Sequence, residues 1–292
     1  MSAAAADGAD GRSRRFDGRI VVVTGGASGI GRACAEVLAE EGADVVVADL
    51  DAAKAADVAQ ALGGRAYAID VSRAADIETL AQRVEREVGA VDLLINAAGI
   101  IQGAAVRPEE LPIETYDRVF GVNLRGTYAA CVAFGRRMAA RQRGAIVNIA
   151  SISGMRSTPL HAYGPMKAAV IRLTENLAAE WGRSGVRVNC LSPGPVLTPA
   201  LQDAIDKGQR DRARMEASAA SGCLVMPREV ALAAAFLLSD DASAITGVNL
   251  PVDHGWLVAN SWASFGGVRE LSRPTGAGPG QDDPIQPKET TK

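Results

Sequence analysis

Short runs of apolar, β-branched residues alternate along the chain with longer stretches of helical periodicity. Within each run the apolar residues are consecutive rather than alternating, which is typical of strands buried on both faces. Seven such runs lie at residues 19–23, 43–49, 65–70, 91–99, 144–151, 186–194 and 247–253. The pattern predicts an α/β fold in which helices cover both faces of a mostly parallel, doubly wound seven-stranded sheet.

The two ends of the chain depart from this pattern. Residues 1–15 are rich in Ala, Asp and Gly, and residues 273–292 are rich in Pro, Gly and charge, so neither end can bury much apolar surface. We expect both ends to be disordered and residues 16–258 to form a single domain. Residues 259–272 carry two large aromatic side chains, which favours packing at a subunit interface over a solvated tail.

Composition narrows the functional classes. The chain has 292 residues, 48% of them hydrophobic, and a formal net charge of −3, which gives no reason to expect nucleic acid or an anionic membrane as partner. No run approaches the ~20 apolar residues of a membrane span, and the N-terminus lacks the apolar core of a signal peptide, so we expect a cytoplasmic protein. The four cysteines form no CxxC pair, and we expect no metal site.

A glycine-rich stretch, TGGASGIGR, follows the first apolar run and carries Gly25, Gly29 and Gly31. Such a turn lets the backbone approach a pyrophosphate, and the N-terminus of the next helix supplies N–H donors and a partial positive charge. Asp49 ends the second run, where a carboxylate can accept hydrogen bonds from the adenosine ribose. The stretch predicts a dinucleotide site; a plain tight turn with a solvated aspartate is the alternative.

Asp49 also bears on which dinucleotide binds. A 2′-phosphate beside its carboxylate would bring two anions within a few ångströms, and Asp51 adds negative charge. Lys54 is the nearest following cation, and we expect its helical position to turn it away. The sequence therefore predicts NAD(H) as the cofactor in preference to NADP(H).

Tyr163 and Lys167 stand four positions apart in HAYGPMKAAV, so a helix would place them on one face. A cation beside a phenol can lower a pKa that is otherwise about 10, which would make a usable proton donor. An incidental pair at the start of a surface helix is the alternative. Pro165 lies between them and matters little only in a first helical turn, so we infer a helix start near Gly164. A kinked helix that already begins at Thr158 is the other possibility.

The Thr-Gly-x(3)-Gly-x-Gly spacing, the INAAG run at 95–99 and the Tyr-x(3)-Lys pair together resemble the short-chain dehydrogenase/reductase (SDR) family in its single-domain form. The resemblance covers about residues 16–258. It implies a Rossmann-type fold and direct hydride transfer between a nicotinamide cofactor and a secondary alcohol or ketone. It also implies a set of cofactor-binding residues: Gly25, Ser28, Gly29, Ile30, Gly31, Asp49, Leu50, Asp70, Val71, Asn96, Ala97, Gly99, Tyr163, Lys167, Pro193, Gly194, Val196 and Thr198.

The same resemblance implies four catalytic residues: Asn123, Ser151, Tyr163 and Lys167. In the family the asparagine bends its helix and holds a water in a proton relay, and the serine hydrogen-bonds the substrate oxygen. The tyrosine is the general acid or base, and the lysine holds the nicotinamide ribose and favours the tyrosinate. Ser153 rivals Ser151, which stands 12 residues before Tyr163 where 13 is usual in the family. We favour Ser151 because the strand end fixes its register.

Substrate and partners are less constrained. Ser153, Arg156 and His161 lie in the loop where family members contact substrate, although a solvated arginine and a packed histidine would also fit. Residues 199–227 correspond to the mobile lid of the family, and their charge favours a small polar alcohol or ketone such as a polyol, sugar or hydroxy acid. Helices around 112–141 and 164–182 correspond to the pair through which family members form tetramers, so we expect a homotetramer.

Two other functions compete with this interpretation. An NADPH-dependent 3-oxoacyl-type reductase would share every catalytic residue but would favour a basic residue near Asp49. A catalytically silent dinucleotide sensor or scaffold protein would need only the cofactor-binding half. The presence of all four catalytic residues argues against the silent protein.

Overall fold

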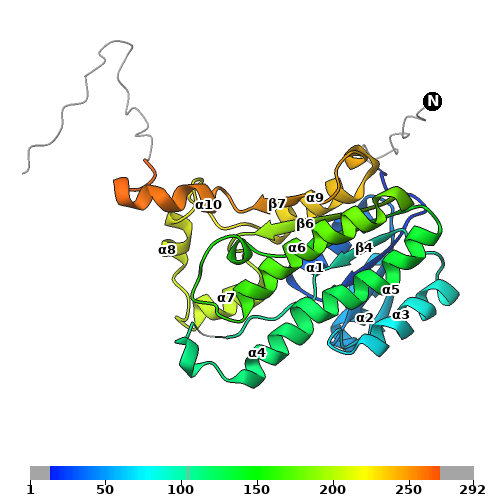
Figure 1. Cartoon of the computed structure of the whole chain (residues 1–292), viewed down its shortest axis with the longest axis horizontal. Helices are drawn as coiled ribbons and strands as arrows, with labels where there is room; N and C mark the ends of the chain where they lie inside the picture. The colour runs from blue at the N-terminus through cyan, green and yellow to red at the C-terminus, as the bar shows by residue number, and fades with distance from the viewer. Residues whose placement is uncertain (1–13, 104, 270–292) are drawn as a thin grey trace, which may run out of the picture.

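The computed structural model describes residues 14–103 and 105–269 (Figure 1). Seven strands form one fully parallel sheet in the order β3-β2-β1-β4-β5-β6-β7. The strands are β1 Ile20–Thr24, β2 Asp44–Asp49, β3 Arg65–Ala68, β4 Leu93–Asn96, β5 Gly144–Ile149, β6 Val186–Pro193 and β7 Asn249–Val252. The predicted doubly wound sheet is confirmed. The strand order reverses between β1 and β4, and ligands of such sheets bind at this switch point.

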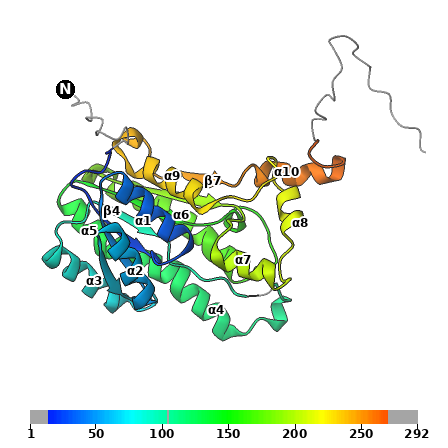
Figure 2. The same cartoon turned by 180° about the vertical axis from the view of Figure 1, so that it is seen from behind.

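Helices cover both faces of the sheet. One face packs against α1 (Gly29–Glu40), α2 (Ala52–Leu62) and α9 (Pro227–Leu238), and two of these, α1 and α2, lie toward the viewer in Figure 2. The other face packs against α3 (Ala74–Glu87), α5 (Thr127–Ala140) and the C-terminal half of α6 (Tyr163–Trp181). Valines of β1 and β2 alternate between the two cores, which is why their runs are apolar at every position.

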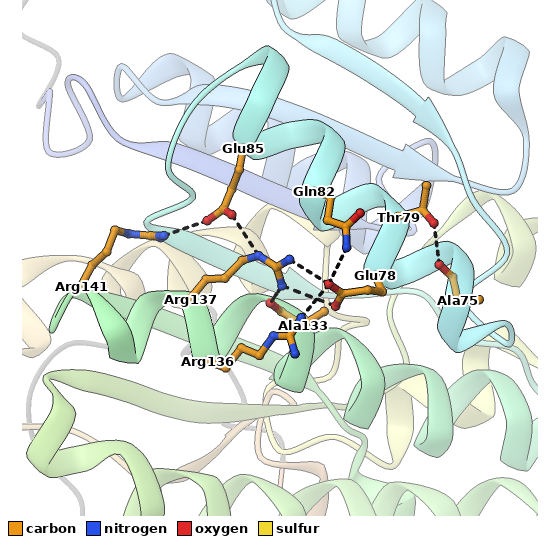
Figure 3. Close-up of polar contacts among 9 residues, drawn as sticks. All are labelled: Ala75, Glu78, Thr79, Gln82, Glu85, Ala133, Arg136, Arg137 and Arg141. Atoms are coloured by element: carbon orange, nitrogen blue, oxygen red, sulfur yellow. Dashed lines mark hydrogen bonds and ion pairs between the residues drawn. The ribbon is translucent and has the colours of Figure 1, made fainter.

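The helix predicted at 112–141 is one helical stretch with a local change of pitch. It consists of α4 (Ile113–Phe120), a π-helical turn η2 (Gly121–Gly126) and α5. A network of ion pairs joins α5 to α3 (Figure 3): Arg137 lies between Glu78 at 2.8 Å and Glu85 at 2.9 Å. Hydrogen bonds from Arg137 lower the pKa of the Glu78 carboxyl. These ion pairs hold α5 against α3, and α5 directly follows the π-helical turn η2, which carries Asn123.

The remaining elements lie beyond one end of the sheet. The segment after β6 contains α7 (Pro199–Asp206) and α8 (Arg212–Ala217), and the segment after β7 contains α10 (Trp256–Ala259) and the 3₁₀ turn η6 (Asn260–Phe265). α7, α8 and α10 gather on this side in both views (Figure 1, Figure 2). Shorter 3₁₀ turns lie at η1 Pro108–Glu110, η3 Ile152–Gly154, η4 Gly182–Ser184 and η5 Asp240–Ala242.

The expected tails fall largely outside the described residues, apart from Arg14 and Arg15. Arg15 forms an ion pair with Glu41 at 2.7 Å, and Phe16 beside it is buried. Among the described residues, no helix is both long and apolar enough to cross a membrane.

Candidate active site

The glycine-rich turn between β1 and α1 is folded tightly against the end of β4. Gly25 has a φ of +68°, and a Cβ at this position would lie 2.6 Å from the backbone nitrogen of Ala98. A Cβ on Gly31 would lie 2.1 Å from the carbonyl oxygen of Gly25. Both positions therefore require glycine, and the turn leads through Ser28 to the N-terminus of α1, where N–H groups without intrahelical partners favour an anion.

Asp49 lies at the end of β2, and its carboxylate is fixed by the chain around it. Its Oδ2 accepts from the Ala27 N–H at 3.0 Å and its Oδ1 from the Asp51 N–H at 3.0 Å. The first of these contacts ties the carboxylate to the glycine-rich turn. Leu50 beside it is 74% exposed. Each carboxylate oxygen keeps a second lone pair that can accept from a ligand hydroxyl.

The prediction that Lys54 faces away is wrong. Asp51 caps α2 by accepting from the Lys54 N–H, and the Lys54 ammonium lies 2.8 Å from the Asp51 carboxylate. The side chain therefore turns back toward the end of β2. There it is engaged by Asp51 on the exposed surface.

The third and fourth strands bring further predicted residues to this edge. Asp70 accepts from the Ser72 N–H at 2.9 Å, with the half-buried Val71 between them. Asn96 is buried, and its Nδ2 donates to Asn148 Oδ1 at 2.9 Å, inside the protein. Its Oδ1 has no hydrogen-bond partner among the described residues. The side chain of Asn96 thus belongs to an interior polar network, while Ala97 and Gly99 carry the exposed part of the strand end.

The segment after β6 lies against the glycine-rich turn. Thr198 caps α7 by accepting from the Leu201 N–H at 3.3 Å. Its methyl carbon lies 3.2 Å from the position of a Cβ on Gly29. Pro193 ends β6, and Gly194 donates its N–H to Val252 at 2.9 Å. The structure thus brings this predicted segment, including the buried Val196, beside the turn.

Ser151, Tyr163 and Lys167 meet at the end of β5. Ser151 is buried two positions after the end of β5, and its Oγ accepts from the Ser153 N–H at 3.1 Å. Lys167 is buried; its Nζ donates to the Ile149 carbonyl at 2.7 Å and lies 5.5 Å from the centre of the Tyr163 ring. The three side chains are therefore neighbours.

Burial shifts both titratable groups toward their neutral forms. It raises the pKa of the Tyr163 phenol above its usual value, an effect that a hydrogen bond with the Ser151 side chain opposes. Burial also lowers the pKa of Lys167 to about 8. Both shifts have the same cause, because burial without a facing opposite charge among the described residues disfavours the tyrosinate and the ammonium alike, and such perturbed groups are typical of functional sites.

The helix start around Pro165 resolves as predicted. α6 begins at Tyr163, which makes Pro165 its third residue, and residues 158–162 are not helical. Its missing N–H falls in the first turn, where no backbone hydrogen bond is lost. The kinked alternative is excluded, and Lys167 lies one turn after Tyr163.

Asn123 is buried in the π-helical turn η2 and clamps the loop after β4. Its Oδ1 accepts from the Ile100 N–H and its Nδ2 donates to the Ile100 carbonyl, both at 2.8 Å. A Cβ on Gly99 would lie 3.3 Å from Asn123 Oδ1 and 3.5 Å from Lys167 Nζ. Gly99 therefore leaves open the space beside these two side chains.

The predicted substrate contacts lie in the loop from η3 to α6. Ser153 is half-buried, whereas Arg156 and His161 are exposed. Arg156 donates to the carbonyl of its neighbour Met155 at 3.1 Å. The side chains of Arg156 and His161 are therefore at the surface and can contact a ligand.

The segment corresponding to the predicted lid is tied down at its end. Val196 and Val225 form a parallel bridge, which closes the segment at its base. Ser221 Oγ lies 3.1 Å from His254 Nδ1, and His254 Nε2 lies 3.1 Å from Glu229 Oε2. Sequence reasoning missed this cluster, because its three residues come from separate segments.

Gln102 was also missed. It follows INAAGII in a stretch without periodicity, where a polar residue normally faces solvent, yet it is buried. Its Oε1 accepts from the N–H groups of Ala162 and Tyr163 at the start of α6. The one available signal was a polar residue between Ile101 and the helix-breaking Gly103, and that signal is weak.

Comparison with known proteins adds to this geometry. Residues 25–257 match a family profile described as Enoyl-(Acyl carrier protein) reductase. D-threitol dehydrogenase of Mycolicibacterium smegmatis is 41% identical over 250 residues, which cover 84% of this chain and 95% of that protein.

Two solved structures from Brucella melitensis share the fold. One, described as ribose-5-phosphate isomerase, is 52% identical with a TM-score of 0.86, covering 87% of this chain and 98% of that one. The other, described as a 3-oxoacyl-[acyl-carrier protein] reductase with bound NAD, is 33% identical with a TM-score of 0.74, covering 83% and 92%.

Proposed function

The chain belongs to the short-chain dehydrogenase/reductase family, and we propose that it is an NAD(H)-dependent enzyme that interconverts a secondary alcohol and a ketone. Membership makes it an oxidoreductase that acts on a CH–OH group, and a dinucleotide, NAD or NADP, is typical of the family. The choice of cofactor, the substrate class and the roles of individual residues are our proposals.

One observation carries the proposal: Ser151, Tyr163 and Lys167 are neighbours, and Lys167 lies beside the space that Gly99 leaves open. The Lys167 ammonium is 5.5 Å from the Tyr163 ring, and both it and Asn123 border the position of a Gly99 Cβ. The same strand-end region adjoins the glycine-rich turn through the contact of Gly25 with Ala98. Proton chemistry and a backbone suited to a dinucleotide thus share one edge of the sheet.

The residues present fit a dinucleotide. A side chain at Gly25 or Gly31 would fill the turn, and the Asp49 carboxylate has lone pairs left for ribose hydroxyls. When bound, the cofactor supplies the hydride acceptor or donor at its nicotinamide. A carboxylate in this place disfavours a 2′-phosphate, which supports NAD(H). The ion pair of Lys54 with Asp51 leaves that lysine engaged by another carboxylate.

The roles of the chain's own groups follow from their contacts. In oxidation the Tyr163 oxygen takes the proton of the alcohol, and in reduction it returns a proton to the ketone oxygen. The Ser151 hydroxyl hydrogen-bonds the same substrate oxygen. The Lys167 ammonium favours the tyrosinate and so opposes the rise in the Tyr163 pKa that burial causes. Asn123 holds the loop at Ile100, which keeps Gly99 beside Lys167.

We propose a small polyol or related hydroxy compound as substrate. The similarity to a D-threitol dehydrogenase supports this class. The exposed Arg156 and His161 add polar groups in the loop that precedes Tyr163.

The proposal is tested by a panel of polyols, sugars and hydroxy acids with NAD⁺, starting with D-threitol, in which reduction of NAD⁺ is followed by absorbance. We expect turnover of at least one polyol, and loss of that turnover in Tyr163→Phe with NAD⁺ binding retained. An NAD⁺ titration by calorimetry provides the binding control. No turnover across the panel, in a protein that binds NAD⁺, would favour the silent-sensor interpretation.

A second candidate is a 3-oxoacyl-type reductase. The family profile and one Brucella structure, both described as acyl-carrier-protein reductases, favour it. The panel therefore includes a 3-oxoacyl thioester with NADH and with NADPH. Isomerisation of ribose 5-phosphate without added dinucleotide is also measured, because one similar structure is described as an isomerase. Aldose–ketose isomerisation needs no net hydride exchange with a cofactor, so activity in that assay alone would contradict our proposal.

We also propose a homotetramer. Ile113 and Tyr128, on α4 and α5, are 64% and 51% exposed, and large apolar side chains of this kind mark association surfaces. Trp262 and Phe265, near the C-terminal end of the described chain, are 49% and 87% exposed and support packing of residues 259–272 at an interface. Light scattering of the full chain tests this.

A further inference from the structure

Gln102 is in an unusual position for a loop glutamine. It comes from the loop after β4, is 7% exposed, and reaches the start of α6, which lies 60 positions later in the chain. Its Oε1 accepts from the Ala162 N–H at 2.8 Å and from the Tyr163 N–H at 3.2 Å. One side-chain oxygen thus serves two of the N–H groups that a helix start leaves without intrahelical partners.

We propose that Gln102 is a positioning residue for Tyr163, fixing the backbone that carries the phenol toward Ser151. The inference rests on the proposed role of Tyr163 as the acid or base. Ala162 has no side-chain oxygen, so the residue that precedes the helix cannot cap it, and no other side-chain cap is present among the described residues. The capping group is supplied from the opposite side of the site instead.

The neighbouring contacts make this cap matter for the chemistry. Ile100, two positions before Gln102, is the residue that Asn123 clamps at 2.8 Å through both backbone groups. One short loop therefore receives the Asn123 clamp and delivers the cap to Tyr163. Tyr163 is the first helical residue, and the Gly164 N–H beside it donates to the Leu160 carbonyl at 2.9 Å. Gln102 adds the hydrogen bond to the N–H of Tyr163 itself.

A neutral amide suits this place better than a carboxylate. A buried anion beside Tyr163 would oppose formation of the tyrosinate. The amide has a drawback, because Gln102 Nε2 is buried without a hydrogen-bond partner among the described residues. Gln102 thus supplies a neutral acceptor to the start of α6 and leaves its own donor unpaired within the described part of the chain.

Two variants separate positioning from simple stability. Gln102→Met keeps the length and volume of the side chain and removes the acceptor. Gln102→Glu keeps the acceptor and adds charge. Gln60→Met, at an exposed position of α2, is the matched control for the exchange itself. The tyrosinate absorbance of each protein is measured in the near ultraviolet as pH rises, without substrate. Subtracting the titration of Tyr163→Phe from that of the wild type leaves the signal of Tyr163 alone, and the same subtraction is made for each Gln102 variant.

The expected results differ in sign. In Gln102→Met the phenol loses its fixed buried place, so its pKa falls toward the ordinary value of about 10, and turnover of the panel substrate drops about tenfold or more. In Gln102→Glu the pKa of Tyr163 rises further, and the alkaline optimum for oxidation moves to higher pH. Gln60→Met matches wild type in both measurements.

Two results would overturn the inference. One is a Tyr163 titration that is unchanged in both Gln102 variants. The other is lower turnover in Gln102→Met with the titration unmoved, which would mean that Gln102 acts on something other than Tyr163. A failure of the underlying function is recognised separately, because Tyr163→Phe would then remain active whatever the Gln102 variants do.

Discussion

The cofactor side and the chemical side of the sheet edge are held together differently. On the cofactor side the polar contacts of Asp49 stay within the unit of β1, α1 and β2: its carboxylate accepts from the Asp51 N–H two positions on and from the Ala27 N–H 22 positions back. Gly25 and Gly29 add packing contacts with Ala98 and Thr198 from later segments.

On the chemical side the groups come from four segments, namely the loop after β4, η2, the end of β5 and the start of α6, and most of their contacts join one of these segments to another. Asn123 and Ile100 are 23 positions apart, and Gln102 and Ala162 are 60 apart.

This difference has a mechanical consequence. The glycine-rich turn and Asp49 are held by hydrogen bonds within one strand–turn–helix–strand unit, whereas the position of Tyr163 depends on the packing of the β4 loop, the π-helical turn and α6 against one another. Substitutions on the cofactor side should therefore change mainly cofactor binding and the stability of the turn. A substitution in one segment of the chemical side should also change the position of catalytic groups in the other segments.

Gly31→Ala should break the cofactor side most severely. The new Cβ would lie 2.1 Å from the Gly25 carbonyl oxygen, so the turn must shift, and we expect the free energy of unfolding to fall by about 4 kcal/mol, near the upper end for single substitutions. Binding of NAD⁺ should weaken with it. Gly182→Ala is the control, since a Cβ there meets nothing within 4 Å. Equal denaturation midpoints for the two variants would contradict the close packing of the turn.

Lys167 on the chemical side should make the stability of the free enzyme depend on pH. Burial lowers its pKa to about 8 in the folded protein, against about 10.4 in an unfolded chain. Between these values the unfolded chain binds more protons, so stability rises with pH. The unfavourable contribution of the charged lysine, about 3 kcal/mol, is fully present below pH ~8 and is lost by pH ~10.

Urea unfolding of wild type and of Lys167→Met across this range measures the effect. The variant lacks the titrating group. As pH rises from about 8 to about 10, the free energy of unfolding of the wild type should therefore increase relative to that of the variant. Parallel curves would show that the lysine is not buried in its charged form.

Asp49→Ser should change cofactor choice without touching the proton chemistry. At 4 Å and an effective dielectric near 20, the repulsion between the Asp49 carboxylate and a 2′-phosphate is about 4 kcal/mol per unit charge before screening. Half of that, about 2 kcal/mol, corresponds to well over tenfold in kcat/KM. Wild type should therefore prefer NAD⁺ by more than tenfold, and the variant should lose most of this preference. Equal kcat/KM values in the wild type would refute the assignment.

Deleting residues 273–292 should have the smallest effect. This stretch lies outside the described residues, and its composition offers no apolar surface to bury, so we expect a change in stability below about 0.5 kcal/mol and unchanged activity. Truncation after Leu257 also removes Trp262 and Phe265 and should reduce the oligomer size or the stability. An unchanged oligomer after the longer cut would contradict packing of residues 259–272 at an interface.

The same division between local and distant contacts explains what the sequence could predict. The seven strands, the glycine-rich turn and the first-turn position of Pro165 follow from residues close together in the chain, and the structure has all three. Gln102 could not be predicted, because its burial depends on a helix start 60 positions away. The His254–Glu229–Ser221 cluster was hidden for the same reason.

Two local details were also missed. Lys54 was expected to face away, but the capping of α2 by Asp51 draws its ammonium to that carboxylate. Asn96, which the family resemblance places among the cofactor-binding residues, has its side chain hydrogen-bonded to Asn148 inside the protein, a contact that the sequence pattern does not predict. In both places a neighbouring polar group, rather than helical or strand periodicity, decides where the side chain points.

The most direct test of the account is the turnover of Tyr163→Phe, measured with NAD⁺ and a substrate identified by the panel, alongside NAD⁺ affinity by calorimetry. General acid–base groups typically contribute about 10²–10⁴-fold, so kcat should fall by at least a hundredfold while the dissociation constant of NAD⁺ stays near that of the wild type. A variant that keeps more than about a tenth of the wild-type kcat would show that Tyr163 is not the proton donor.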